Sequence, residues 1–237
     1  MSVKSYIKRW MPGRMIVALR CLMKGYPLPR WGNLRRTNPF SANYGFERGT
    51  PVDRFYLERF LMKNQHFISG KVLEIQASSY TRRLGHQVVE AHSVDINGEM
   101  NPTFLCDLAE CDRVIPSDYY DCFLLPNTVS QLRRPHESLQ HALRVVRPGG
   151  VILGSSCVLL PLIPDGPQYW HITQYGWMEL SRGVWPNCEV HIESHGNCLV
   201  AVAAMLGLAL EELRQEELEA NDPRYPVLIT FFCRKPE

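Results

Sequence analysis

The sequence predicts an α/β protein with a doubly wound, mostly parallel sheet. From residue 51 onward, short apolar segments of strand length alternate with longer segments of helical periodicity. Buried strands that alternate with helices are typical of an open sheet covered by helices on both faces. The expected strands, in chain order, cover residues 71–76, 87–95, 104–106, 120–126, 151–155, 188–194 and 227–234.

Sequence signals mark the starts and ends of the main helices. Residues 50–53 (TPVD) combine a hydroxyl cap, a proline at the first helical position and an acid in the first turn, which predicts a helix to about residue 64. A helix over 135–146 is expected to end at the RPGG turn, residues 147–150. Further helices are expected over residues 173–182 and 199–213.

The first 36 residues form a separate basic segment. They carry nine Lys and Arg residues and no acid, whereas the remaining chain carries 17 basic and 24 acidic residues. Within residues 14–24 the apolar positions recur at i, i+3, i+4, i+7 and i+8, which predicts one amphipathic helix that stops at Gly25 and Pro27. The chain therefore divides into a basic helical arm, residues 1–36, and one domain, residues 37–237.

Several partners remain open for this arm. The helix of the arm could pack on the domain, or on a second subunit, which would make a homodimer. It could instead dock on an anionic membrane surface or on a partner protein. Nucleic acid is disfavoured, because no basic and aromatic platform follows and the rest of the chain is net acidic.

Composition indicates a reduced, cytoplasmic protein, with peripheral membrane attachment through the arm as a variant. The most apolar helical run, residues 198–210, is shorter than the roughly 20 residues that a membrane span needs. The eight cysteines show no CxxC or Cys/His ligand spacing, so no metal site is expected.

Three acids mark the expected carboxyl ends of strands, where an open α/β sheet binds its ligands. Glu74 lies in the first strand, Asp95 closes the second, and Asp107 follows the third. An acid about 20 residues after the first strand can accept hydrogen bonds from ribose hydroxyls, and a later one from an adenine amino group. Taken singly, each acid can also be a cap or a turn residue.

Five ordered blocks resemble the class I S-adenosylmethionine-dependent methyltransferases. The blocks are VLEIQASSYT, SVDING, CDLAE, YYDCFLLPNTVSQL and LRVVRPGGVIL. The resemblance covers roughly residues 45–237, and it implies a Rossmann-like sheet of seven strands with an antiparallel last strand. FERGTPVDRFYLERFL and DPRYPVLITFFCRKP look like a bacterial subgroup associated with glycosyltransferases of polysaccharide synthesis.

The resemblance also implies a cofactor, S-adenosylmethionine, with S-adenosylhomocysteine as its product, and roles for single residues. Asp95, followed by Ile96, would hold the ribose, and Asp107 with the backbone of Leu108 would recognise adenine. The methionine half would be bordered by Glu74, Gln76, Ser78 and Ser79, and the transferring methyl group by Asn127 and Thr128. Arg48 or Arg82 could pair with the methionine carboxylate.

The loop after the first strand departs from the family pattern. Residues 76–79 read QASS where the family has glycines, which give a tight turn and let the backbone approach the ligand. Hydroxyl groups of Ser78, Ser79 and Thr81 could replace some backbone contacts. The loop therefore leaves two interpretations, an unusual cofactor loop or a lost cofactor.

The catalytic candidates follow the fifth strand. Residues 164–171 (PDGPQYWH) combine an acid, a histidine and two aromatics, which suits the lining of a sugar-like acceptor site. His171 is the first choice for the base that accepts a hydroxyl proton, and Asp165 is the second. His171 at the start of a helix can equally be a packed structural residue.

The leading hypothesis is an S-adenosylmethionine-dependent methyltransferase that acts on an oxygen of a glycan or a related small acceptor. A glycosyltransferase is a candidate partner, because of the subgroup resemblance. The alternative hypothesis is a catalytically inactive, methyltransferase-like protein that serves as a partner in an assembly. No P-loop or Gly-x-Ser-x-Gly elbow supports another chemistry.

Overall fold

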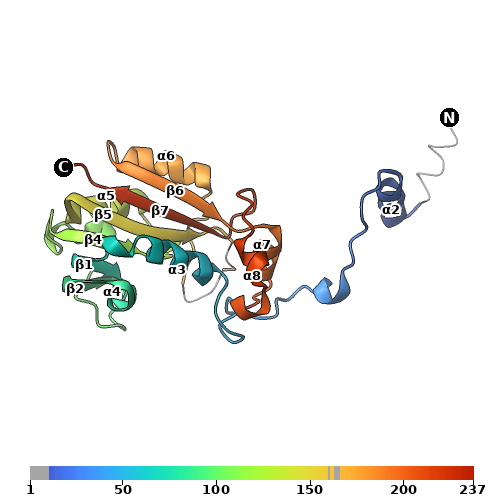
Figure 1. Cartoon of the computed structure of the whole chain (residues 1–237), viewed down its shortest axis with the longest axis horizontal. Helices are drawn as coiled ribbons and strands as arrows, with labels where there is room; N and C mark the ends of the chain where they lie inside the picture. Colours follow the sequence, from blue (N-terminus) through green and yellow to red (C-terminus); the bar gives the residue numbers. More distant parts are fainter. Residues whose placement is uncertain (1–10, 160, 163–165) are drawn as a thin grey trace. The chain divides into compact units, whose positions relative to one another are not determined.

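The computed structural model describes residues 11–159, 161–162 and 166–237 (Figure 1). The chain separates into two compact units, Met1–Asn38 and Pro39–Glu237. The first unit contains the helix α2 (Gly13–Met23) and the 3-10 helix η1 (Gly32–Leu34).

One seven-stranded sheet forms the centre of the second unit, in the order β3-β2-β1-β4-β5-β7-β6. β1 to β5 run parallel, whereas β7 is antiparallel to both of its neighbours, β5 and β6. The predicted doubly wound, mostly parallel sheet with an antiparallel last strand is therefore confirmed. The strands are β1 (Gly70–Ile75), β2 (Val88–Asp95), β3 (Phe104–Leu105), β4 (Tyr120–Leu125), β5 (Val146–Cys157), β6 (Glu189–His195) and β7 (Leu228–Arg234).

Helices cover both faces of this sheet (Figure 1). α3 (Asp53–Lys63) and α7 (Cys198–Met205) contribute to the hydrophobic core on one face. α5 (Pro135–Val145) and α6 (Gln174–Val184) close the other, where the ring of Trp177 stacks on Phe231 with centroids 4.4 Å apart. The shorter elements are α4 (Ser79–Leu84), α8 (Gln215–Glu219), η2 (Gln65–Phe67), η3 (Leu108–Arg113), η4 (Val129–Gln131) and η5 (Leu210–Glu212).

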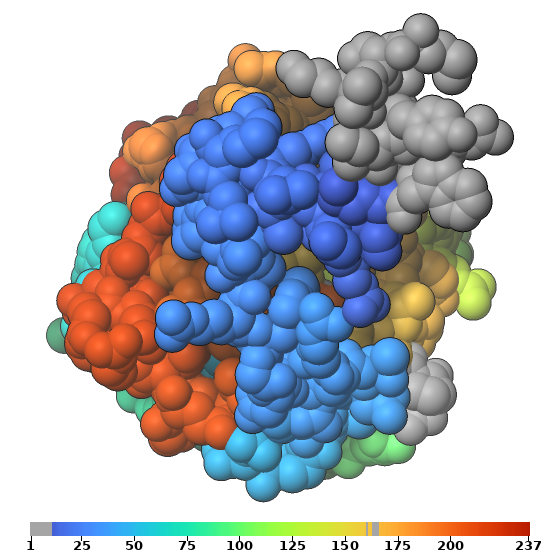
Figure 2. Space-filling model, turned by 90° about the vertical axis from the view of Figure 1, so that its right-hand side faces the viewer, coloured from blue at the N-terminus to red at the C-terminus, as the bar shows by residue number. Residues whose placement is uncertain are grey.

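The helix predicted over residues 199–213 is wrong in its second half. α7 ends at Met205, and Gly207 has a left-handed φ of 68°. A Cβ at Gly207 would collide with the backbone oxygen of Ser41, so the chain turns here to let residues 39–41 pack closely. α7 and α8 then lie at the surface of the domain, where they are orange-red in Figure 2.

The predicted turn at residues 147–150 lies inside a strand. α5 ends at Val145 and β5 begins at Val146, which pairs with Tyr120 of β4. The pairing register shifts between Tyr120 and Cys122, and Gly149 takes a φ of 73°, so the RPGG segment forms an irregularity in β5. The regular part of the strand starts near residue 151, as the apolar run predicts.

Residues 39–51 are packed against the chain after α7. The backbone NH of Phe40 donates to the carbonyl of Leu206 at 2.7 Å, and Pro51 forms an isolated antiparallel bridge with Ala209. Thr50 donates from its hydroxyl to Glu211 at 2.7 Å. These contacts position α3, whose first residue lies at the carboxyl ends of β4 and β5.

Candidate functional site

The carboxyl ends of β1, β2, β4 and β5 meet at one edge of the sheet, since these strands are parallel. β1 pairs with β2 on one side and with β4 on the other, so the strand order reverses at β1. Ligands of open α/β sheets bind at such a reversal, beyond the carboxyl ends of the strands. The sequence-predicted residues 74–79, 95–96, 107–108 and 127–128 belong to β1, β2 or the segments that follow β1 to β4.

Glu74 binds the first turn of α4. Its carboxylate is 1% exposed and accepts bonds from the hydroxyl groups of Ser79 (3.2 Å) and Thr81 (2.7 Å). It also accepts from the backbone NH groups of Tyr80 (3.0 Å) and Thr81 (2.8 Å). The carboxylate therefore fixes the loop after β1 by binding NH groups that lack a partner within the helix.

The glycine-poor loop is tight despite its side chains. Gln76 takes a left-handed φ of 69°, and it is the only residue of segment 76–79 with a positive φ. Its NH donates to the carbonyl of Val94 at 2.9 Å, which ties the loop to β2. The NH groups of Ala77 and Ser79 donate within the loop, to Ile75 and Ala77, each at 2.8 Å.

Asp95 and Ile96 lie at the carboxyl end of β2. The Asp95 carboxylate is half-buried and accepts one bond, from the backbone NH of Asn97 at 3.0 Å. Its second oxygen has no protein partner among the described residues. The Ile96 side chain is 73% exposed, so it offers an open apolar surface beside this carboxylate.

Asp107 caps the 3-10 helix η3 and pairs with a cation. Its Oδ1 accepts from the NH of Ala109 at 2.9 Å, and its Oδ2 lies 3.4 Å from Nη2 of Arg134. Arg134 donates more closely to Glu110, at 2.7 Å, and these two acids, Glu110 first, raise the pKa of the guanidinium. Leu108 is buried in the core.

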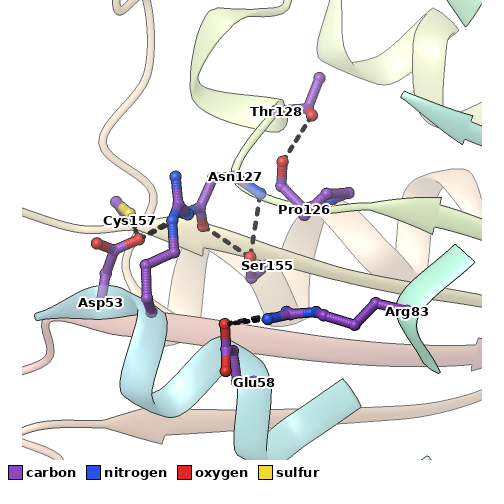
Figure 3. A network of polar contacts seen from close by, with 9 residues as sticks. Asp53, Glu58, Arg83, Pro126, Asn127, Thr128, Ser155 and Cys157 are labelled. Carbon is purple, nitrogen blue, oxygen red and sulfur yellow. Dashed lines mark hydrogen bonds and ion pairs between the residues drawn. The ribbon is translucent and has the colours of Figure 1, made fainter. Parts of the chain in front are cut away.

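A polar network joins the carboxyl ends of β4 and β5 to α3 (Figure 3). The backbone NH of Asn127 donates to Oγ of Ser155 at 3.0 Å, and this hydroxyl donates back to Oδ1 of Asn127 at 2.7 Å. The side-chain NH₂ of Asn127 donates to Oδ2 of Asp53 at 2.6 Å. Thr128 bonds only locally, from its hydroxyl to the carbonyl of Pro126.

Asp53 is the centre of this network. Its Oδ2 also accepts from Nη1 of Arg54 at 3.0 Å and from the thiol of Cys157 at 3.6 Å. Burial, together with the Asp53 charge, raises the pKa of Cys157 well above its usual value, so the thiol stays protonated. Burial opposes the charge of Arg54, but the Asp53 carboxylate favours it, and the pKa of the guanidinium is raised.

Asp53, Arg54, Ser155 and Cys157 were not among the predicted site residues. In the sequence, Asp53 is a first-turn acid and Cys157 an apolar filler. The signal that could have found them is the pair Ser155-Ser156, two polar residues at the carboxyl end of an otherwise apolar strand.

Arg48 is held by an acid of η5. Its Nε donates to Glu212 at 2.9 Å and its Nη2 to the other oxygen of the same carboxylate. The Arg48 bond lowers the pKa of Glu212 to about 2, with help from the NH of Ala209. The structure therefore places Arg48 in a bidentate pair, while Arg54 lies in the network at the ends of β4 and β5. Arg82, the other cation considered, lies in α4.

The aromatic segment after β5 is anchored on the segment after β4. The NH groups of Tyr169 and Trp170 both donate to the carbonyl of Ser130, at 2.8 and 3.1 Å. The indole NH of Trp170 donates to Leu132 at 2.7 Å, and both rings remain 42% exposed. His171 is exposed and has no hydrogen-bond partner among the described residues. Asp165 lies outside the described residues.

A hollow of about 480 Å³ lies apart from these residues, between α3, β6 and the α8 region. Its wall includes His195, whose ring stacks on Tyr56 with centroids 5.7 Å apart. Nε2 of His195 lies 2.8 Å from Oγ1 of Thr230, and the hydroxyl of Tyr56 donates to Leu218. Burial raises the pKa of Tyr56 to about 12 and lowers that of His195.

No group of His, Cys, Asp and Glu side chains among the described residues is arranged to hold a metal ion. None of the helices in the described part of the chain is long and apolar enough to cross a membrane.

Comparison with solved structures identifies the fold. The plantazolicin methyltransferase BamL, in complex with a triazolic desmethylPZN analogue and SAH, matches with a TM-score of 0.52 and 14% identity over 82% of this chain and 88% of BamL. An S-adenosylmethionine-dependent methyltransferase from Mesorhizobium loti matches with a TM-score of 0.51 and 12% identity, over 78% and 98% of the two chains.

A third similar structure has a different activity. The 4+2 cyclase SpnF matches with a TM-score of 0.52 and 14% identity, over 94% of both chains. No family model and no curated protein matches the sequence. The chain thus has the fold of S-adenosylmethionine-dependent methyltransferases, and its reaction has to be argued from its own residues.

Proposed function

We propose that this protein is an S-adenosylmethionine-dependent methyltransferase that acts on an oxygen of a glycan or a related small acceptor. One observation carries the proposal: the half-buried Asp95 carboxylate stands at the end of β2, beside the strand reversal, with one oxygen that bonds to no described residue. A carboxylate at this place suits the two hydroxyls of a ribose.

The backbone conformation of the loop after β1 is compatible with cofactor binding, although the loop lacks the usual glycines. Only Gln76 needs the left-handed backbone for which glycine is usually required, and the bond from its NH to Val94 holds that conformation. Asp95 would hold the ribose, Ile96 would lie against adenine, and Asp107 with the backbone of Leu108 would bind the adenine amino group. The loop residues Gln76, Ser78 and Ser79 would border the methionine half.

Arg54 is the better candidate than Arg48 for the methionine carboxylate. Arg48 already donates from Nε and Nη2 to the two oxygens of Glu212, whereas Arg54 shares its partner Asp53 with Asn127 and Cys157. The methionine carboxylate of the cofactor would be a second acceptor for the Arg54 guanidinium, whose pKa is raised by its surroundings.

Acceptor binding is assigned to the aromatic segment after β5. Tyr169 and Trp170 are anchored through their backbone yet leave their rings partly open, which suits contact with the apolar face of a sugar. When bound, the cofactor supplies the electrophilic methyl group. His171 would accept the hydroxyl proton of the acceptor, with Asp165 as the second choice. A glycosyltransferase partner follows from the subgroup resemblance alone.

Calorimetric titration with S-adenosylhomocysteine tests the proposal. We expect binding by the natural chain and a loss of at least tenfold in affinity for D95N, which keeps the shape of the side chain and removes its charge. D118N, a change to an exposed acid in the loop before β4, is the matched control. A folded natural chain that binds neither S-adenosylmethionine nor its product at millimolar concentration would reject the proposal.

A second candidate function is an inactive, methyltransferase-like assembly partner. It is favoured by the hydrogen bonds of the loop, because the NH groups of Gln76, Ala77 and Ser79 already have protein acceptors. Replacement of Ala77 and Ser79 by glycine discriminates between the two. If only this variant binds the cofactor, the natural chain is the inactive form.

A further inference from the structure

Within the unit Met1–Asn38, no described residue covers the apolar side of α2. None of the eleven residues of α2 is buried, and Leu22 and Met23 are 66% and 81% exposed. At 100° per residue, one side of the helix carries Met15, Ile16, Ala18, Leu19, Leu22 and Met23. A contiguous exposed apolar side of this kind marks a surface that binds a protein or a membrane.

The charges of α2 and of the residue that caps it, Lys24, lie on the opposite side and have one sign. Arg14, Arg20 and Lys24 are exposed, and no described acid pairs with any of them. The arm as a whole contains nine cations and no acid, so no side chain within it neutralises this charge. The surface that fits such a helix has an apolar interior and carries negative charge where it meets water.

Aromatic residues follow the helix. Tyr26 and Trp31 are 61% and 48% exposed, and the guanidinium of Arg35 lies 5.4 Å from the centre of the Trp31 ring. Tyr and Trp are enriched at the boundary between lipid headgroups and hydrocarbon, where their rings are half apolar and half polar. The charge distinguishes a lipid partner from a second copy of the chain, because a second arm would bring nine more cations against these nine, whereas anionic headgroups neutralise them.

We propose that the arm binds an anionic lipid surface, with α2 in the plane of the interface. Eleven residues make a helix about 16 Å long, too short to cross the hydrocarbon core and long enough to bury one side in it. The cations beside the apolar side then face the phosphates of the headgroups. This attachment is independent of cofactor binding by the domain.

Vesicle flotation of the full-length protein tests this proposal. Vesicles of phosphatidylglycerol and phosphatidylcholine are compared with vesicles of phosphatidylcholine alone, and each is repeated at 0.5 M NaCl. We expect flotation with the anionic vesicles, weakened by salt. Replacement of Arg14, Arg20 and Lys24 by Gln should lower the partition coefficient roughly 100-fold, since each cation contributes a several-fold effect near such a surface.

Two further variants separate charge from apolar contact. L19Q/L22Q keeps every charge and should also abolish flotation. R182Q/R214Q/R224Q removes three exposed cations from the domain and should leave flotation unchanged. Calorimetry with S-adenosylhomocysteine and thermal melting, run on all variants, should be unaffected by the arm substitutions, so a failure here differs from a failure of the proposed function.

Three results would overturn the proposal. The first is equal flotation with neutral and anionic vesicles. The second is flotation that survives both arm variants. The third is a fall in mass on analytical ultracentrifugation caused by L19Q/L22Q in the absence of vesicles, because a second copy of the chain would then be what covers the apolar side of α2.

Discussion

The side-chain amide of Asn127 donates to the carboxylate of Asp53 across 2.6 Å, although 74 positions separate the two residues in the sequence. The bond joins the segment after β4 to the first residue of α3. It holds the helix that precedes β1 against the edge where the parallel strands end, and it brings Arg54 to the same place.

Replacement of Asp53 by Ala should destabilise the domain by about 2 kcal/mol, because the Asn127 amide and the Arg54 guanidinium lose their acceptor in a largely buried place. Urea unfolding measures the change, with an unchanged m-value as evidence that the folded state is otherwise the same. E179A removes an acid from an exposed ion pair with Arg182 and should have no measurable effect. A D53A variant as stable as the natural chain would contradict the prediction.

Replacement of Glu74 by Gln should cost about 1–3 kcal/mol. The carboxylate accepts four bonds from Ser79, Tyr80 and Thr81, and an amide of the same shape turns one acceptor into a donor that faces other donors. Chemical denaturation checks this value. E58Q, which changes a surface pair with Arg83, is the isosteric control, and equal losses in the two variants would count against the role given to Glu74.

The sheet could be predicted from the sequence because its strands are short, apolar and separated by helices with clear periodicity. Where the prediction was wrong, a distant contact helped to decide the local structure. The helix after residue 199 ends early, before Gly207, which takes a left-handed φ and packs on Ser41; the glycine is a local stop signal, and the contact with Ser41 is what the sequence does not reveal. Local propensity is routinely overridden by such tertiary contacts.

The candidate site was predictable only where one strand end supplies the residue. Asp95 follows from its place at the end of an apolar run, and it lies at the end of β2. The network around Asp53 joins α3, β5 and the residue after β4, so its members are unremarkable in their own segments. Arg48 was a reasonable candidate by charge, but its bond to Glu212 depends on how residues 39–51 pack.

Replacement of Gln76 by Gly should leave the stability unchanged or raise it by up to about 1 kcal/mol. At a φ of 69° the side chain of Gln causes steric strain that Gly avoids. The relief of this strain offsets the greater conformational entropy of Gly in the unfolded chain. A77G, one position later and with no left-handed backbone to relieve, should lose about 0.5–1 kcal/mol. Thermal unfolding of both variants gives the comparison, and a larger loss for Q76G than for A77G would reject it.

His195 should make the domain less stable in mild acid. Burial, the dominant cause, and the cations Lys63 and Arg59 lower its pKa from 6.5, while Glu193 opposes them. The folded state therefore binds this proton less readily than the unfolded state. Neutral His195 therefore contributes stability that is fully present well above pH 6.5. This contribution is lost as the pH falls from 6.5 through the lower pKa of His195 in the folded state.

Urea unfolding of the natural chain and of H195Q, from pH 7.5 to pH 5, measures this effect. We expect the free energy of unfolding to fall more steeply with acid in the natural chain than in H195Q, which keeps a polar group near Thr230 and cannot titrate. Burial and Arg144 also lower the pKa of His141. The H141Q variant therefore measures separately how much His141 adds to the pH dependence of stability. Parallel pH profiles of H195Q and the natural chain would show that His195 titrates alike in both states, and the buried stack on Tyr56 would then have no part in acid sensitivity.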